Sequence, residues 1–403
     1  MKTRLLTFAL FAVTAITVTF YPAMQSNSAT SITPHRIEPV ITIPFANERP
    51  KIEVVFVLDT TGSMGGLIQA AKEKIWSIAT TMASAQSAPE IKMGLVAYRD
   101  RGDQYVTRVI DLSADLDSVY ASLMDFQAQG GGDGPESVNQ ALDDAVTKIS
   151  WSQDQDTYKV VFLIGDAPPH MDYQDDVKYP ISLKTAHRNG IVINTIQCGK
   201  DHSTSRDWQQ IAQLGGGNYF QVEQTGSAIA MTTPYDNKLA TLSEELDDTR
   251  LYYGSAEEKV RQAKKQAATK KLHAAGSMAS RARRAAFNTT VSGAENLLGE
   301  KELVDGVTSG KVDLADLKQE MLPASIQALA PAEQQAAIKE KAERRKELLD
   351  EMKQLNKQRS SYLKDKVAAS GDANDSLDHK IYRTLKAQAE KKGIMYESET
   401  PEY

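Results

Sequence analysis

Short apolar runs alternate with longer amphipathic segments between residues 51 and 250, and this alternation predicts the fold of the first half of the chain. Uninterrupted apolar runs such as 160–164 and 191–196 are typical of strands buried on both faces of a parallel sheet. We therefore expect a doubly wound, mostly parallel, Rossmann-like α/β domain over residues 51–250. The expected strands are 52–59, 91–99, 106–112, 159–166, 190–199 and 218–222, and the expected helices are 67–85, 137–149, 181–189 and 206–214.

The strand pattern ends near residue 251, and Ala, Lys, Glu, Gln and Arg dominate from there to residue 403. This composition predicts an all-α C-terminal region over residues 251–403. Its last helix is expected to begin at Asp375 or Ser376, either of which can cap it, and to stop at Gly393. Apolar positions recur at helical spacing between these ends, at Leu377, Ile381, Leu385 and Ala389.

A seven-residue spacing within residues 333–366 raises the question of a coiled coil. Leucine and tyrosine keep that spacing at Leu348, Leu355 and Tyr362, but the partner positions are Arg345, Met352 and Arg359. A coiled-coil seam would be apolar at both sets of positions. Two alternatives stay open: a helical module packed on itself or on the α/β domain, which the charged positions favour, and self-association through an intermolecular coiled coil.

The amino-terminal segment has the order of a secretory signal. Two basic residues precede an apolar stretch over residues 5–20, and small residues follow at Ser26 and Ser28. This order predicts a signal peptide over residues 1–28, cleaved after Ser28, with retention as a short membrane anchor as the alternative. Residues 29–50, rich in Pro, Thr and Ser, are expected to be a linker.

Composition limits the class of protein. A chain of 403 residues with 41% hydrophobic content is expected to form two domains. The net charge of -6, with both signs interspersed, gives no reason to expect a nucleic-acid partner. Cys198 is the single cysteine, so there is no intrachain disulfide. Together with the predicted signal peptide, this favours a bacterial periplasmic or secreted protein.

Candidate metal ligands lie in three loops that follow predicted strands. The first loop, after the apolar run VVFVL, carries Asp59, Thr61 and Ser63. The second is GGGDGPES over residues 130–137, and the third begins at Asp166 in LIGDAPPH. Carboxylate and hydroxyl oxygens suit a hard divalent cation, and glycines let the backbone turn towards it. We expect Mg²⁺ first, with Mn²⁺ and Ca²⁺ as alternatives, whereas zinc is not expected.

The segment DTTGSM at residues 59–64 resembles the DxSxS motif of von Willebrand factor type A (vWA) domains, with Thr in place of the first Ser. The resemblance covers about residues 51–250. It implies a metal-ion-dependent adhesion site, in which the cation keeps one coordination position open for a carboxylate of a partner protein. Asp59, Thr61 and Ser63 match the first loop of that site, and Asp166 matches the aspartate that closes it.

The second loop departs from the family, which usually has a threonine ligand there. Asp133 is the candidate for that position and Glu136 is second. A carboxylate there would strengthen metal affinity and weaken the attraction of an acidic partner group, so the partner group need not be a carboxylate. If both side chains turn outward, the loop is only a glycine-rich cap.

Other residues near these loops have simpler interpretations. Asp100 and Asp103 follow a strand at the same edge of the sheet and are candidates for the rim of the metal site. The tripeptide Arg101-Gly102-Asp103 is interpreted as a chance occurrence in a chain of this length. His170 is either a contact for a partner or a surface loop residue. The GGGDGPES loop lacks the lysine of a phosphate-binding loop, and its own acidic residues would repel phosphate.

The leading functional hypothesis is an exported, non-enzymatic, metal-dependent module that binds a partner protein. The alternative is a metal-dependent hydrolase that uses the same ion to activate water. His170 and Glu136 are the only nearby candidates for a general base, and no nucleophile lies at a spacing that would pair with either of them. A third hypothesis is a helical scaffold with a vestigial metal site.

Overall fold

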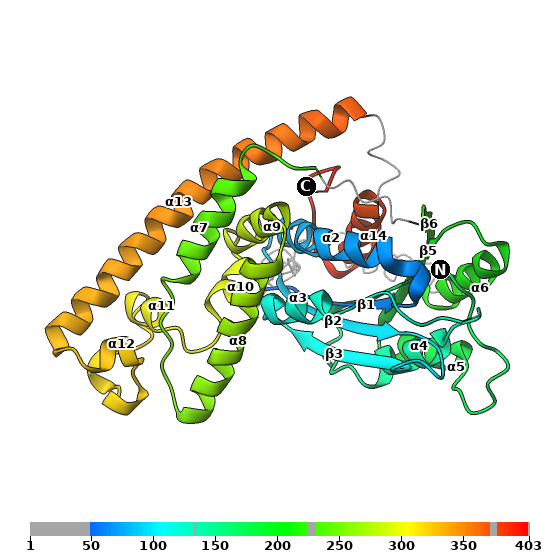
Figure 1. Ribbon diagram of the computed structural model, residues 1–403, viewed down its shortest axis with the longest axis horizontal. Helices are drawn as coiled ribbons and strands as arrows, with labels where there is room; N and C mark the ends of the chain where they lie inside the picture. Colours follow the sequence, from blue (N-terminus) through cyan, green and yellow to red (C-terminus); the bar gives the residue numbers. More distant parts are fainter. Residues whose placement is uncertain (1–48, 133, 225–230, 371–376, 402–403) are drawn as a thin grey trace, which may run out of the picture. The chain divides into compact units, whose positions relative to one another are not determined.

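The computed structural model describes residues 49–132, 134–224, 231–370 and 377–401 and contains a six-stranded sheet (Figure 1). The strand order is β3-β2-β1-β4-β5-β6. Only the pairing of β2 with β3 is antiparallel, so the doubly wound, mostly parallel sheet predicted from the sequence is confirmed. The strands are β1 Lys51–Asp59, β2 Glu90–Tyr98, β3 Thr107–Ser113, β4 Tyr158–Gly165, β5 Ile191–Cys198 and β6 Gly216–Val222.

Alternate residues of the central strands supply the two faces of the sheet to two separate cores. Val54 and Phe56 of β1 face a core that contains α2 Gly65–Ala83 and α3 Leu116–Met124, and Val55 and Val57 face the opposite core. The opposite core contains the helices α4 Val138–Thr147, α5 Tyr179–Arg188 and α6 His202–Leu214. The α3 helix, which Asp115 caps by accepting a hydrogen bond from Ser118 N, is absent from the elements expected above.

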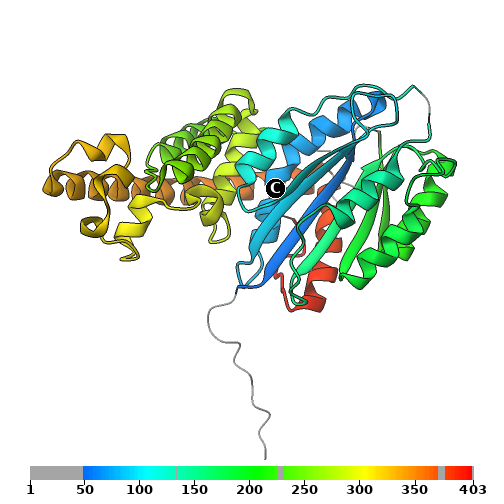
Figure 2. The same cartoon turned by 90° about the horizontal axis from the view of Figure 1, so that it is seen from below.

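The helical region follows β6 and includes the long helix α13, shown in orange in Figure 2. Leu348 and Met352 of α13 are fully buried against α7 and α9. Arg345 donates hydrogen bonds to Glu302 at 2.9 and 3.0 Å, so the positions examined for a coiled-coil seam form contacts inside the chain. The helices of this region are α7 Asp236–Asp247, α8 Ala256–Ala275, α9 Met278–Asn288, α10 Gly293–Leu298, α11 Leu303–Thr308, α12 Ala324–Gln327 and α13 Pro331–Ser370, with short 3-10 turns η2 Leu314–Asp316 and η3 Gln319–Met321.

The last helix, α14 Leu377–Ala389, packs on the sheet itself. Ile381 and Leu385 are buried in the same core as β1 and α2. After the 3-10 turn η5 Glu390–Lys392, Gly393 adopts the left-handed conformation (φ 73°) that suits a glycine stop. The capping residues expected at Asp375 and Ser376 lie outside the described residues. A fragment that ends at residue 250 would therefore lack part of the core of the α/β domain.

A buried ion cluster joins α9 to α3 and α7. Arg284 is fully buried, and its Nε and Nη2 donate to the two carboxylate oxygens of Asp117 at 2.6 Å. Its Nη1 donates to Asp247 at 2.7 Å. Burial by itself would raise the pKa of Asp117, but the charge of Arg284 holds that pKa well below its ordinary value.

The predicted signal segment and all but the last two residues of the predicted linker lie outside the described residues. Within the ranges given above, none of the helices combines the length and the apolarity needed to cross a membrane.

Replacing Arg284 by methionine should leave Asp117 and Asp247 buried without their cation. We expect the free energy of unfolding to fall by about 3–5 kcal/mol, measured by urea denaturation of the full chain. The control is Arg344→Met, which removes an exposed pairing with Glu245 and should change the free energy of unfolding far less. Equal effects of the two substitutions would contradict the role assigned to Arg284.

Candidate functional site

The candidate site lies where β1 and β4 end. Asp59 is the last residue of β1, and Asp166 directly follows β4. The strand order changes direction between these two parallel neighbours, and such a switch point leaves a crevice at the carboxyl ends of the strands. The short 3-10 turn η1 Gly62–Met64 and then α2 follow Asp59, which places loop one on this crevice.

Asp59 is buried with half of its carboxylate unpartnered. Its Oδ1 accepts hydrogen bonds from the amide of Thr61 at 2.9 Å and from Thr61 Oγ1 at 2.7 Å. Its Oδ2 is buried and has no hydrogen-bond partner. Burial raises the pKa of Asp59 to about 7; the bonds from Thr61 oppose this shift and the charge of Asp166 adds to it. Hydrogen bonds therefore compensate a negative charge on Asp59 only in part.

Glu136 brings a second buried carboxyl to the site. Its backbone amide donates to Pro168 O at 3.0 Å and its carbonyl accepts from His170 N at 3.1 Å, which ties loop two to loop three. The side chain is 3% exposed, and its Oε2 has no partner. Burial, reinforced by nearby carboxylates of which Asp59 is the first, raises the pKa of Glu136 to about 9. At neutral pH Glu136 therefore holds a proton.

Gly131 explains why Glu136 lies beside loop one. A Cβ added to Gly131 would lie 2.9 Å from Thr61 Cβ and 3.2 Å from Glu136 Oε1. Its φ of +73° also favours glycine. The backbone of loop two thus passes between these two side chains. Asp133, the first candidate in this loop, lies outside the described residues.

Tyr98 is a site residue that the sequence reasoning missed. It lies opposite Asp59 in the pairing of β1 with β2, and its hydroxyl is buried without a partner. A Cβ on Gly165 would meet Tyr98 Oη at 2.4 Å and Asp59 Oδ2 at 3.1 Å, so both oxygens lie against this glycine. Burial, with the charges of Asp59 and Glu136, raises the pKa of Tyr98 well above its ordinary value. Strand register was the signal that could have identified it.

Gln224, which follows β6, was also missed. Its Nε2 donates to Asp166 Oδ2 at 2.6 Å and lies 3.4 Å from Ser63 O. Ser63 itself is exposed, with its Oγ 3.5 Å from Thr61 Oγ1. Gln224 therefore contacts both loop one and loop three. It donates a hydrogen bond to one carboxylate oxygen of Asp166, a residue that the sequence analysis assigned to a metal.

Asp100 and His170 belong to a network beside the site. Asp100 accepts hydrogen bonds from Ser137 Oγ and from the hydroxyl of Tyr173, both at 2.8 Å. His170 Nδ1 lies 2.8 Å from Asp172 Oδ1, and Nε2 lies 3.3 Å from Asp100 Oδ2. His170 is buried and stacks on Tyr173, so the expectation of a surface histidine was wrong. These contacts hold loop three in place.

The Arg-Gly-Asp tripeptide is engaged inside the chain. Asp103 Oδ2 accepts from Gly131 N at 3.2 Å and from Asp100 N at 3.3 Å. Arg101 pairs with Asp175 and Asp176 at 2.9 and 2.5 Å. Asp103 thus supports loop two through its contact with the amide of Gly131.

The donor chemistry fits a hard cation that uses hydroxyl and water ligands as well as carboxylates. Across the described residues, no three His, Cys, Asp or Glu side chains gather closely enough to hold a metal by themselves. The buried oxygens of Asp59, Glu136 and Tyr98 nevertheless lack partners, and buried polar atoms without partners are unfavourable. Oxygens from Thr61, Ser63 and Asp166 lie on the neighbouring loops and could complete a coordination shell.

Comparison with known proteins agrees with this architecture. Residues 53–224 match the family model described as von Willebrand factor A domain. The von Willebrand factor A domain-containing protein 7 of Rattus norvegicus is 34% identical over 120 residues, which cover 30% of this chain and 12% of that protein. A putative ariadne-like RING finger protein, R811, of Acanthamoeba polyphaga mimivirus is 25% identical over 119 residues, covering 30% of this chain and 11% of that protein. The matched segments therefore span only about a tenth of these relatives.

Among solved structures, proximal thread matrix protein 1 from the mussel byssus, with a zinc-occupied MIDAS motif, has a TM-score of 0.33 and 17% sequence identity. The alignment covers 43% of this chain and 42% of that one.

Without a cation, stability should depend on pH through the two buried carboxyls. The pKa values of Asp59 and Glu136, about 7 and about 9, lie above the ordinary 3.8 and 4.5. The folded chain then binds more protons than the unfolded chain between about pH 4 and pH 9, so the free energy of unfolding should fall as pH rises through that window. Urea denaturation in chelator at about pH 5, 7 and 9 measures this.

Glu136→Gln should reduce the fall in the free energy of unfolding at the upper end of this pH range. Glu257→Gln, at an exposed helical position, should not change that fall. A Glu136→Gln profile identical to that of the wild type would contradict the buried, protonated state assigned to Glu136.

Gln224→Ala should free Asp166 Oδ2 and so increase affinity for a divalent cation, by about two- to tenfold, because one hydrogen bond no longer competes for that oxygen. Calorimetric titration of Mg²⁺ and Mn²⁺ measures the change. The matched control is Gln221→Ala, which removes a contact to Gly199 O outside the site. Unchanged or weaker affinity in Gln224→Ala would show that Gln224 does not limit access to Asp166.

Proposed function

Because residues 53–224 form a von Willebrand factor A domain, we propose that this chain is an exported, metal-dependent protein-binding module. The observation that supports it best is the group of buried oxygens from Asp59, Glu136 and Tyr98 that have no partner at the carboxyl edge of the sheet. A cation would compensate the carboxylates that burial otherwise keeps protonated.

The residues proposed to hold the ion are Asp59, Thr61, Ser63, Glu136 and Asp166. When bound, a divalent cation would supply a directional contact to an oxygen of a partner protein. Asp59 Oδ2 and Glu136 Oε2 are the buried acceptors that can turn to it without breaking a hydrogen bond. Glu136 would release its proton on binding, because its pKa of about 9 applies to the metal-free protein. Mg²⁺ is proposed first, with Mn²⁺ and Ca²⁺ as alternatives.

Glu136 also bears on the chemistry of the partner. A carboxylate at loop two adds negative charge beside Asp59 and Asp166, and like charges repel an incoming acidic group. The preferred partner oxygen is therefore proposed to be neutral, such as a backbone carbonyl or an amide side chain.

Binding is favoured over hydrolysis by the contacts of the two base candidates. His170 has its ring nitrogens beside Asp172 and Asp100 and is stacked on Tyr173, which holds it within loop three. Glu136 holds its proton at neutral pH in the metal-free protein, and a general base must be deprotonated. We therefore propose that the chain is not an enzyme.

Calorimetric titration of Mg²⁺, Mn²⁺ and Ca²⁺ into the metal-stripped full chain tests the proposal. The full chain is needed because α14 completes the core around β1. We expect saturable one-site binding with proton release, and at least about a 100-fold loss of affinity in Asp59→Asn, which keeps the shape of the side chain but removes its charge.

The matched control is Asp156→Asn, an exposed aspartate just before β4 at the opposite edge of the sheet, which should bind like the wild type. Absence of ion uptake by the folded wild type, or full affinity in folded Asp59→Asn, would overturn the proposal.

A further inference from the structure

A basic pocket of about 650 Å³ lies between α2, α9 and α13, away from the candidate metal site. Five Lys or Arg side chains line it, and none of the lining residues is Asp or Glu. The cationic residues are Arg283 from α9 and Lys353, Lys357, Arg359 and Lys364 from α13. Such a lining gives the pocket a positive potential.

The two arginines of the lining are buried. Arg359 Nε donates to Asp236 at 2.9 Å, and Arg283 Nη1 lies 3.6 Å from Glu73 Oε2. Each arginine therefore contacts a carboxylate that lies outside the lining. The lysines add charge beyond these pairs. Lys353 and Lys357 are exposed and form no ion pair with a carboxylate in the described part of the chain, although Asp350 lies near enough to Lys353 to feel its charge.

Ser77 adds an uncommitted donor to the pocket. It is 3% exposed and its Oγ has no hydrogen-bond partner. Its neighbours on α2 differ, because Thr80 Oγ1 donates to Trp76 O at 2.8 Å and Ser84 Oγ donates to Thr81 O at 2.7 Å. A buried hydroxyl without a partner is unfavourable, so a ligand that accepts its proton would be stabilised.

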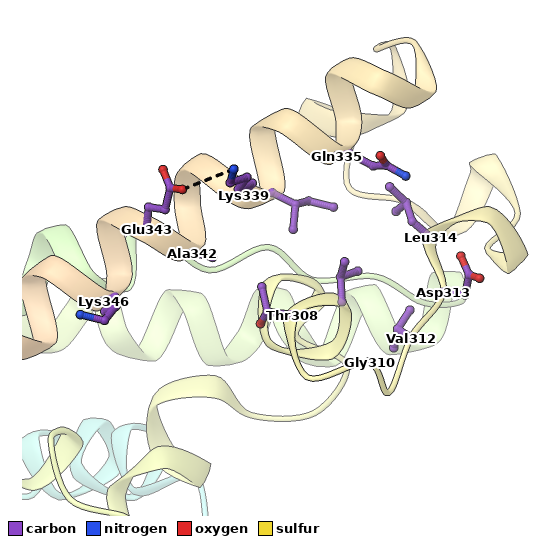
Figure 3. A pocket seen from close by; sticks show the side chains of 12 residues that line it. Thr308, Gly310, Val312, Asp313, Leu314, Gln335, Lys339, Ala342, Glu343 and Lys346 are labelled. Atoms are coloured by element: carbon purple, nitrogen blue, oxygen red, sulfur yellow. Dashed lines mark ion pairs between the residues drawn. The ribbon is translucent and has the colours of Figure 1, made fainter.

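A second cavity beside α13 has a lining of mixed charge, so a basic lining is not shared by both cavities along this helix. It has a volume of about 580 Å³ and lies between the amino-terminal part of α13 and the segment 307–314 (Figure 3). Its lining includes Asp313 and Glu343 as well as Lys339 and Lys346, and Lys339 pairs with Glu343 at 3.8 Å. Mixed charge of this kind gives no preference for an anion.

We propose that the basic pocket binds a small phosphorylated anion. Phosphate oxygens accept several charge-assisted hydrogen bonds, which Lys353, Lys357 and Ser77 can donate. The volume falls within the range of about 300–1,000 Å³ typical of small-molecule sites. The same chemistry could come from a free phosphate ester or from a lipid headgroup. This inference is independent of the metal site and of the proposed function.

Calorimetric titration of inorganic pyrophosphate into the full chain tests the proposal, in chelator and at ionic strength held constant with NaCl. We expect saturable binding that weakens at least about tenfold in the double variant Lys353→Gln, Lys357→Gln, and also weakens in Ser77→Ala. The matched control is Lys339→Gln, Lys346→Gln, which removes the same charge from the same helix at the other cavity and should leave binding unchanged.

Failure of the folded wild type to take up pyrophosphate would overturn the proposal, as would an equal loss of affinity in the two double variants. Sedimentation with phosphatidylcholine vesicles containing phosphatidic acid then separates the two sources. Vesicle binding lost in Lys353→Gln, Lys357→Gln identifies a lipid headgroup, whereas pyrophosphate binding without vesicle binding identifies a free phosphate ester.

Discussion

Repulsion among carboxylates at the carboxyl edge of the sheet is the constraint on which the candidate site depends. The fold places Asp59 and Glu136 out of contact with water and within electrostatic reach of Asp166. Arg99 lies at this edge, but its Nε donates to the carbonyl oxygen of Thr60 rather than to a carboxylate. The negative charge must therefore be relieved either by protons or by an ion from solution.

The ion cluster around Arg284 shows the opposite solution to the same problem. There the chain itself provides the cation, and both Asp117 and Asp247 are paired with it in the interior. Asp117 and Asp247 thus differ from Asp59 and Glu136, each of which keeps a buried carboxylate oxygen without a partner. This contrast is the physical reason for regarding the crevice as the candidate site for an exchangeable ligand.

Much of the α/β architecture could be predicted because its strands are buried on both faces. Val160 to Ile164 form an unbroken apolar run that few other elements tolerate, and the loops that follow such strands must share one edge. The antiparallel placement of β3 and the short helix α3 could not be derived, because neither has a distinctive period. Among the site residues, the positions of Asp59 and Asp166 could be predicted because each lies at the carboxyl end of a buried strand. The burial of Glu136 depends on the backbone path at Gly131, and the contribution of Gln224 depends on where β6 ends beside loop three.

The packing of α14 has a consequence for how the chain folds during synthesis. Ile381, Leu385 and Tyr396 belong to the same core as β1, although more than 300 residues separate them in sequence. The sheet can pair its strands early, but one of its faces stays incompletely covered until α14 has been synthesised and can pack on it. Completion of the α/β domain therefore waits for α14, and any event that removes this helix would leave an apolar surface on an otherwise finished sheet.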